Sequence, residues 1–236
     1  MPLMTAERRR FLITGGTQGI GAALVQQARA KGHDVVFTGR DQARLERMAA
    51  ETGAHGLRAD VANDADNART VAAVRDLMGG VDVLVNNAAY PYIAEIGELD
   101  VDKMRAMFAT NVFGMVDLTN RVVPLLKAQA SGDIVNLAST SGMKGGKGGT
   151  AYAASKWTVR GMSQVWQAEL RPFGVRVICV CPSEVQTDWG GRSGRNNPNK
   201  LFAADIAATV MNAVDMPRRV LWVELPIFAT NPWKED

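Results

Sequence analysis

The chain alternates short runs of β-branched and other apolar residues with longer stretches whose apolar residues recur at three- and four-residue spacing. The first pattern is typical of β-strands and the second of helices that bury one face. Strands that alternate with helices in this way run parallel, because each helix carries the chain back to the edge where the previous strand began. We therefore predict an α/β fold, a doubly wound and mostly parallel sheet of seven strands with helices on both faces.

The boundaries of these elements follow from the same patterns. The predicted strands are 10–14, 34–38, 55–59, 81–85, 133–138, 175–180 and 219–224. The predicted helices are 19–31, 41–52, 64–78, 101–128, 151–171 and 203–213. No Pro/Ser-rich linker or break in composition interrupts the chain, so we predict one domain over residues 1–236.

Composition excludes several classes of function. With 47% hydrophobic and 22% charged residues, the chain has the make-up of a globular protein with one sizeable core. Its net charge of +3 is dispersed rather than gathered into a basic stripe, so nucleic acid is not an expected partner. The densest basic cluster, "ERRR" at 7–10, is interpreted as a solvated lead-in to the first strand. The apolar stretches are short and broken by charge, so we expect no membrane partner and a cytoplasmic location.

The residues that commonly bind metals are sparse. His33 and His55 are isolated and are expected in surface loops or at strand edges, and no ligand cluster predicts a metal site. Cys179 and Cys181 lie two apart on one face of a predicted strand, too distant to bridge without distortion. We expect both to be buried free thiols.

A glycine-rich segment, "TGGTQGIG" at 14–21, joins the first strand to the first helix. In this setting Gly15 makes a tight turn, Gly19 lets the backbone approach a pyrophosphate, and Gly21 permits close packing of helix on strand. The helix N-terminus adds free N–H groups and a partial positive charge. Together these features predict a dinucleotide-binding loop.

A second motif, "AYAASKW" at 151–157, places Tyr152 and Lys156 one helical turn apart with small residues between them. We expect the ammonium group to lower the pKa of the phenol from its ordinary value of about 10. Such a shift makes Tyr152 an acid/base near neutral pH. Ser139, just past the fifth strand, is placed to hydrogen-bond the oxygen of a reacting carbonyl.

These motifs occur together with "NNAA" at 86–89, "NVFG" at 111–114 and Ser139 in "IVNLAST". Their order and separations resemble the classical short-chain dehydrogenase/reductases, from about residue 10 to about residue 187. The resemblance implies a Rossmann-like subunit that uses NAD or NADP, and a catalytic tetrad of Asn111, Ser139, Tyr152 and Lys156. It further implies that Lys156 grips the nicotinamide ribose and that Asn111 holds a water.

The resemblance also implies a set of cofactor-binding residues, with Asn87 on the side of the adenine ribose and Asp60 and Val61 at the adenine ring. The full set is Gly15, Thr17, Gly19, Ile20, Gly21, Arg40, Asp60, Val61, Asn87, Tyr152, Lys156, Val185 and Thr187. The sequence departs from the family at Ala89 and at Ser183, where glycine is more usual. The second departure puts the local turn in doubt.

The end of the second predicted strand indicates which dinucleotide is preferred. An NAD-type site carries an acidic residue there, whereas this chain has Gly39 followed by Arg40. Glycine leaves room for a 2′-phosphate, and arginine is a permanently charged donor suited to it. Asp41 is expected to cap the following helix. We therefore predict NADP, with NAD the less favoured cofactor.

The leading hypothesis is an NADP(H)-dependent carbonyl reductase or alcohol dehydrogenase that acts on a small-molecule carbonyl or alcohol. Two alternatives remain open: a non-catalytic dinucleotide-binding regulatory or scaffold protein, and an epimerase or dehydratase. The latter is disfavoured because the extended relatives have a larger C-terminal region and a different glycine spacing. Residues 186–201 are interpreted as a substrate lid, and Tyr90, Tyr92 and Trp189 as candidates for an apolar wall.

We also expect a homotetramer or homodimer, because family members commonly associate through the helices equivalent to 101–128 and 151–171. The apolar residues predicted for such an interface are Met104, Met107, Phe108, Val112, Trp157, Val165 and Trp166.

Overall fold

The computed structural model describes residues 7–187 and 197–233. One sheet contains seven strands: β1 (Arg10–Ile13), β2 (Asp34–Gly39), β3 (His55–Arg58), β4 (Val83–Asn86), β5 (Gly132–Leu137), β6 (Val175–Pro182) and β9 (Glu224–Ile227). Their order is β3-β2-β1-β4-β5-β6-β9, and every neighbouring pair is parallel. The winding direction reverses between β1 and β4, as in a Rossmann-like fold. The predicted fold class is confirmed.

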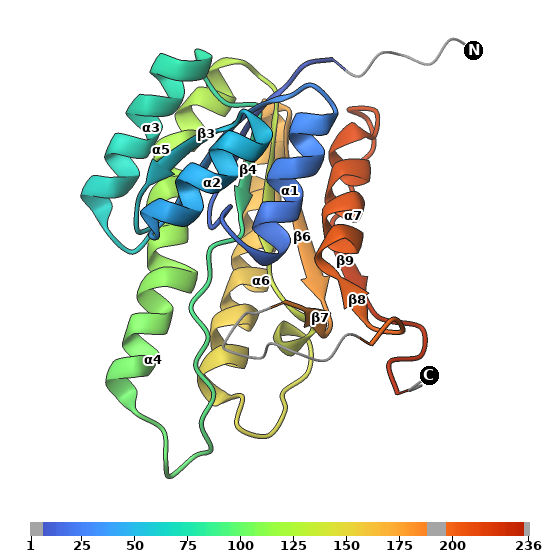
Figure 1. The fold of residues 1–236 in the computed structure, drawn as a ribbon. Helices are drawn as coiled ribbons and strands as arrows, with labels where there is room; N and C mark the ends of the chain where they lie inside the picture. Colours follow the sequence, from blue (N-terminus) through green and yellow to red (C-terminus); the bar gives the residue numbers. More distant parts are fainter. Residues whose placement is uncertain (1–6, 188–196, 234–236) are drawn as a thin grey trace.

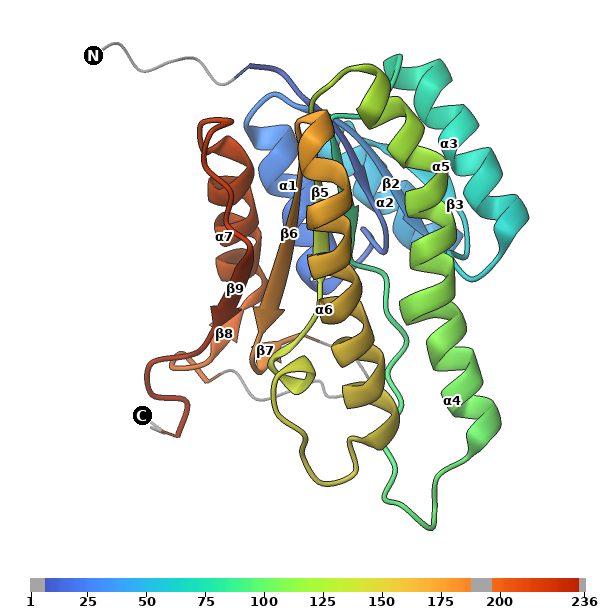
Figure 2. The same cartoon turned by 180° about the vertical axis from the view of Figure 1, so that it is seen from behind.

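Helices cover both faces of this sheet (Figures 1 and 2). One layer consists of α1 (Gly19–Ala30), α2 (Gln42–Thr52) and α7 (Ala203–Asp215), and the other of α3 (Asp64–Met78), α5 (Met115–Ala128) and α6 (Thr150–Leu170). Helix α4 (Val101–Phe108) extends from the α5 end of that layer beyond the ends of the strands. Alternate strand residues serve the two layers: Phe11 and Ile13 pack under α1, whereas Leu12 packs with α3 and α5. This two-sided burial explains why the strands read as continuous apolar runs.

Helix boundaries follow local signals in the sequence. Asp41 caps α2 by accepting a hydrogen bond from the backbone N–H of Arg44, which confirms the predicted capping role. Gly53 and Gly79 end α2 and α3 in the left-handed conformation that glycine adopts at low cost. The stretch predicted as one helix over 101–128 is helical throughout, but residues Ala109–Gly114 form a π-helical segment between α4 and α5.

The last strand was predicted at 219–224 and lies at Glu224–Ile227 instead. The preceding chain is held by Arg176, whose guanidinium donates to the carbonyls of Met216 and Val220 at 3.0 and 2.9 Å. Pairing with β6 begins only when the Val223 carbonyl accepts the N–H of Cys179. Pro226 is tolerated because β9 is an edge strand.

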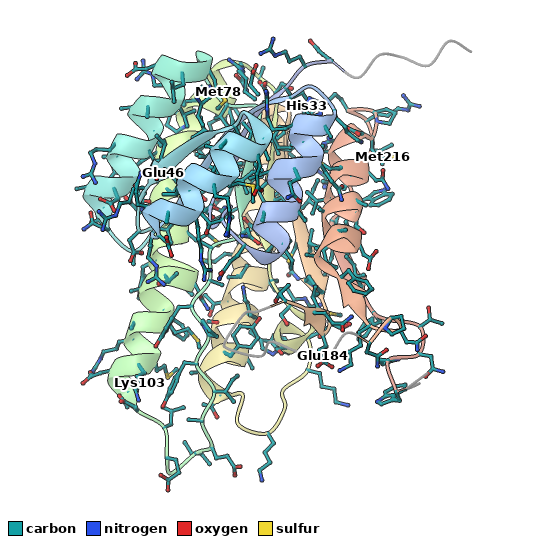
Figure 3. All side chains as sticks on the ribbon, viewed as in Figure 1. His33, Glu46, Met78, Lys103, Glu184 and Met216 are labelled. Carbon is teal, nitrogen blue, oxygen red and sulfur yellow. The ribbon has the colours of Figure 1, made fainter. Side chains whose placement is uncertain are left out.

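Two further predictions need correction at the amino-terminal edge of the sheet. Arg9 and Arg10 do not form a solvated lead-in, because their guanidinium groups pair with Asp133 and Asp82. His33 does not lie in a surface loop, because it is fully buried and stacks on Phe11; it directly precedes β2, the strand-edge position that was the other expectation. Figure 3 shows His33 and Met216 toward the end of the molecule opposite Glu184.

The prediction for the two cysteines is confirmed. Cys179 and Cys181 are free and buried on β6, with their sulfur atoms 3.8 Å apart. In the described ranges, no helix is long and apolar enough to cross a membrane. The cytoplasmic location stays a prediction.

Candidate active site

A cleft of about 1420 Å³ opens at the carboxyl ends of the strands, beside the reversal between β1 and β4. Open α/β sheets bind their ligands at this position because the loops diverge there. The cleft brings together residues from the glycine loop, from the ends of β2, β4, β5 and β6, and from α6. All of the predicted catalytic and cofactor residues line it except Asn111 and Gly21.

The glycine loop has the backbone geometry that its sequence predicts. Gly15 and Gly19 adopt positive φ angles of 65° and 56°, which side chains rarely tolerate. A Cβ on Gly21 would lie 2.2 Å from the Gly15 carbonyl oxygen, so only glycine allows this helix to pack so closely. At Gly19 the nearest atom to such a Cβ is Thr187 Cγ2, at 3.4 Å. The backbone at Gly19 is thus open toward the cleft, where α1 begins.

The N-terminus of α1 remains available to a ligand. Gln18 occupies the N-cap position and makes no side-chain capping hydrogen bond. The first turn contains no acidic residue. Free N–H groups and an uncompensated partial positive charge therefore face the cleft, which suits a pyrophosphate.

Asn87 connects the glycine loop to β4. Its side-chain amide donates to the carbonyls of Thr14 and Gly15 at 2.8 and 3.1 Å, and its backbone N–H donates to Thr14 Oγ1 at 3.0 Å. These bonds fix the loop over the sheet edge. Asn87 also lines the cleft, so it both shapes and borders it.

At the end of β2, Gly39 lies under the side chain of Thr17. A Cβ on Gly39 would lie 2.5 Å from Thr17 Cγ2, so an acidic side chain does not fit there without displacing Thr17. Arg40 extends into solvent beside it and pairs with Asp60 at 3.7 Å. Val61 is buried, and its neighbour Asp60 borders the cleft.

Tyr152, Lys156 and Ser139 meet on the inner side of α6. The ammonium nitrogen of Lys156 lies 5.8 Å from the centre of the Tyr152 ring. Ser139 follows β5 and is buried; its hydroxyl accepts the N–H of Ser141 and contacts the Pro182 carbonyl at 3.4 Å. A hydrogen bond also links the side chains of Ser139 and Tyr152. The predicted serine, tyrosine and lysine therefore converge on one point of the cleft.

The charge states of this group differ from the expectation. Burial raises the pKa of Tyr152 and outweighs the lowering effect of the hydrogen bond with Ser139. Burial also lowers the pKa of Lys156 from 10.5 to about 8. The direction of the Tyr152 pKa is thus opposite to the lowering predicted from Lys156, because burial dominates it. The ammonium group itself donates to the Leu137 carbonyl at 2.7 Å. The tyrosine is protonated at neutral pH, as a proton donor must be.

Asn111 lies in the π-helical segment between α4 and α5 and faces away from the cleft surface. Its oxygen accepts the N–H of Tyr90 at 2.7 Å, and its amide donates to Ser155 Oγ at 3.2 Å. Ser155 in turn donates to the Tyr152 carbonyl. Asn111 is therefore brought to the first turns of α6, and local widening of a helix at such a position is common at functional sites.

The segment after β6 borders the cleft through Val185 and Thr187. Val185 belongs to β7 (Val185–Gln186), which pairs with β8 (Leu201–Phe202). Ser183 has no positive φ angle and donates its N–H to the Ile227 carbonyl, so serine fits where glycine is usual. Of the predicted lid 186–201, residues 188–196, Trp189 among them, lie outside the described residues. Tyr90 lines the cleft, whereas Tyr92 contacts the N-terminus of α4 instead.

Sequence reasoning missed two features of the site. Ser155, read only as a small residue, links Asn111 to Tyr152. Glu184 and Lys200 form an ion pair at 3.0 Å at the rim. The pairing of β7 with β8 brings them together, and no local motif indicates it. Over the described ranges, no group of three or more His, Cys, Asp or Glu side chains is arranged to hold a metal ion.

Comparison with known proteins supports the same assignment. The family model for short chain dehydrogenases matches residues 9–198. An oxidoreductase of Staphylococcus saprophyticus is 34% identical over 221 residues, which cover 89% of this chain and 92% of that protein. An oxidoreductase of Botryotinia fuckeliana is 32% identical over 186 residues, 78% of this chain and 68% of that protein.

Solved structures agree in fold. A serine dehydrogenase complexed with NADP+ superposes with a TM-score of 0.88 at 29% identity, covering 92% of this chain and 94% of that one. An alcohol dehydrogenase from the archaeon Thermococcus sibiricus, complexed with 5-hydroxy-NADP, gives a TM-score of 0.89 at 25% identity, covering 98% and 100%. This chain, with its glycine loop, its seven-stranded parallel sheet and its matched sequence, belongs to the short-chain dehydrogenase/reductase family.

Proposed function

We propose that this protein is an NADP(H)-dependent oxidoreductase that interconverts a carbonyl compound and a secondary alcohol, with Tyr152 as the acid/base. The observation that carries the proposal is the convergence of Tyr152, Ser139 and Lys156 in the cleft that also contains the glycine loop. A non-catalytic binding protein has no need to bury a protonated phenol and an ammonium group at that point.

The residues present fit a nicotinamide dinucleotide. Gly19 leaves the backbone open where α1 begins, and the cleft runs from there to Tyr152. When bound, the nicotinamide supplies the hydride for reduction or accepts it in oxidation. Gly15, Gly19, Ile20, Asn87, Lys156, Val185 and Thr187 all line this cleft, with Thr187 next to Gly19.

The protein's own groups handle the proton. In reduction, Tyr152 donates its phenolic proton to the carbonyl oxygen as negative charge develops there. The Ser139 hydroxyl hydrogen-bonds the same oxygen and holds it against the tyrosine. Lys156, whose ammonium nitrogen lies 5.8 Å from the centre of the Tyr152 ring, would hold the nicotinamide ribose. Asn111 fixes the first turns of α6 through Ser155. Oxidation follows the same path in reverse.

The preference for NADP rests on the end of β2. Thr17 fills the space into which an acidic side chain at position 39 would project, so the site lacks the carboxylate that repels a 2′-phosphate. Asp41 is engaged as a helix cap. Arg40 offers its guanidinium beside this point, with 71% of its side chain exposed. Both of the solved relatives described above hold an NADP-type ligand.

A panel of alcohols, hydroxy acids and their carbonyl partners, assayed with each cofactor by absorbance, tests the activity. Serine and simple alcohols belong in it because the solved relatives are a serine dehydrogenase and an alcohol dehydrogenase. We expect turnover of at least one pair. If no member of the panel turns over while the dinucleotide binds, the non-catalytic alternative is correct.

The variant Arg40→Ala tests the cofactor preference. One charge-assisted hydrogen bond is worth about 1.5–3 kcal/mol, so we expect the ratio of kcat/KM for NADPH over NADH to fall roughly ten-fold or more. Arg47→Ala is the matched control, since Arg47 is an exposed arginine of α2 outside the cleft. A parent enzyme that favours NADH contradicts the proposal.

We propose assembly through the outer surfaces of α4 to α6, which lie side by side in Figure 2. Trp157 and Val165 are 47% and 54% exposed there, and Phe113, which the sequence analysis did not single out, is 66% exposed. Met107 and Val112, predicted for this interface, are buried in the subunit's own core instead. Light scattering is expected to give a dimer or tetramer mass, and a monomer mass at micromolar concentration contradicts it.

A further inference from the structure

A second cavity, of about 340 Å³, adjoins the cleft at the adenosine end. It shares three residues with the cleft, and its full lining is Arg40, Arg58, Ala59, Asp60, Asp66 and Arg69. Three of these six side chains are arginines. A basic cavity that opens beside the proposed ribose site has the charge that binds a phosphate monoester.

The register of the sheet places Arg58 at this point. Gly39, the last residue of β2, pairs with Arg58, the last residue of β3. Residues in register on parallel strands project from the same face, so Arg58 occupies the face from which a side chain at position 39 would project. Two residues earlier, the Cβ position of Gly56 contacts Phe37 and Leu45, which identifies this face as the one under α2.

The charges in the cavity are unequally compensated. Arg69 pairs with Asp66, and Arg40 pairs with Asp60 at 3.7 Å. Within residues 7–187 and 197–233, the Arg58 guanidinium makes no hydrogen bond and no ion pair. It still lies near enough to act on Asp66, whose pKa is lowered first by the Asp60 N–H, then by Arg69 and Arg58, against the effect of burial. Among the described residues, Arg58 is thus the arginine of this cavity that has no ion-pair partner.

We propose that Arg58 is a second specificity-determining residue for the dinucleotide, binding the phosphate on the adenosine ribose together with Arg40. The inference rests on the proposed NADP(H) preference and extends it from one arginine to two on neighbouring strands. Arg40 approaches from the loop after β2, and Arg58 approaches from β3. Two guanidinium groups on adjacent elements supply donors to more than one phosphate oxygen.

Binding of adenosine 2′,5′-bisphosphate and of adenosine 5′-monophosphate, measured by calorimetry, tests the assignment without turnover. For Arg58→Ala we expect the dissociation constant of the bisphosphate to rise about three- to ten-fold, because an exposed charged contact is screened by solvent. Binding of the monophosphate is expected to stay unchanged. Arg58→Lys, which keeps the charge and loses the planar donor pair, should give an intermediate value.

Arg47→Ala is again the matched control and should change neither constant. Inorganic phosphate is a further titrant: competition with the bisphosphate, but not with the monophosphate, identifies this cavity as the phosphate site. Thermal unfolding of each variant shows whether folding is intact.

The outcomes separate the two proposals. If the parent binds both nucleotides equally, the NADP(H) preference fails and the role of Arg58 fails with it. If the parent prefers the bisphosphate and Arg40→Ala reduces that preference while a folded Arg58→Ala does not, the preference stands and the assignment of Arg58 is overturned.

Discussion

The sheet has a buried charged side chain at the amino-terminal ends of its strands and another at their carboxyl-terminal ends. The two differ in how many hydrogen-bond and ion-pair partners they have. At the amino-terminal edge, Asp133 is fully buried. At the carboxyl-terminal edge, Lys156 is 4% exposed. Taking either charge out of water costs free energy, so the difference between them lies in the partners that each one receives.

Asp133 is saturated with partners. Arg176 donates to both of its oxygens at 2.6 and 3.0 Å, Arg218 donates at 2.8 Å, and Arg9 at 2.5 Å. Burial alone raises the pKa of this carboxyl, but the hydrogen bonds of Arg176 and the three positive charges lower it further than burial raises it. Arg9 and Arg176 also donate to the Val214 carbonyl near the end of α7, so this cluster fastens the last helix to β5.

Lys156 has fewer hydrogen-bond acceptors around it than it has donors. Its ammonium group has three donors, and among the described residues the Leu137 carbonyl is the acceptor of its one hydrogen bond. Burial consequently lowers its pKa to about 8. The comparison teaches that the buried charge in the arginine cluster is fully paired, whereas the buried charge in the cleft is held in an unfavourable state, as perturbed groups at functional sites often are.

The largest expected effect is at the carboxyl-terminal edge. Tyr152→Phe removes the proposed proton donor and leaves the ring that packs against α6 and the cleft. We expect kcat to fall by about 10²–10⁴-fold, the usual contribution of a general acid, with little change in dinucleotide affinity. Steady-state kinetics on the best substrate, with fluorescence titration of the cofactor, measure both. A kcat of Tyr152→Phe within about ten-fold of the parent value would contradict the role of Tyr152 as proton donor.

The amino-terminal edge should show the reverse behaviour. Asp133→Asn removes the charge that compensates three arginines, and breaking a buried ion pair from one side costs about 3–5 kcal/mol of unfolding free energy. We expect urea unfolding to shift accordingly, while kcat of the folded fraction stays near that of the parent. Asp76→Asn, on the exposed surface of α3, is the control. A large drop in kcat at unchanged stability would remove the distinction between the two edges.

The pH dependence of the stability difference between the parent and Asp133→Asn gives a sharper test. The pKa of Asp133 in the folded protein lies below its ordinary value of 3.8, so its contribution to stability is present above that value. It is lost as the pH falls through the lower folded-state pKa. The stability difference between parent and Asp133→Asn should therefore be constant near neutrality and shrink below about pH 4. An unchanged difference down to about pH 2 would contradict the assigned pKa.

Much of the fold and site is predictable because it depends on local patterns. The alternation of apolar runs gives the sheet, and the glycine spacing gives the loop at Gly15 and Gly19. The predictions that were wrong concern features that depend on contacts between segments distant in the sequence. The local sequence predicts a solvated Arg9, because its partner Asp133 lies 124 residues further along the chain and is brought beside it only by β5. The last strand starts late because Arg176 holds the preceding chain.

The site shows the same division. Motifs locate Tyr152 and Lys156 on one helical turn, but they do not give the charge states, which depend on burial under β5 and β6. The sequence argument took the four-residue spacing as a direct interaction, whereas the ammonium group turns to the Leu137 carbonyl. Arg58 was missed because its importance comes from the register of β3 beside Gly39, which no short motif encodes.

The smallest effect concerns the stability cost of Lys156. The pKa of this lysine is about 8 in the folded protein and 10.5 in its ordinary state, so below about pH 8 both states carry the proton and the burial cost is fully present. As the pH rises from about 8 to 10.5, the folded protein is neutral at this group while the unfolded chain still binds the proton, and the cost disappears.

Lys156→Met removes the charge and keeps a long apolar side chain. We expect this variant to lose turnover and yet to be more stable than the parent by about 1–3 kcal/mol near pH 7, with the gap narrowing toward about pH 10. Lys144→Met, at an exposed lysine, should show no such gap. Urea unfolding of the three proteins at both pH values decides the matter: a Lys156→Met protein less stable than the parent near neutrality would mean that this lysine, like Asp133, is held for the fold.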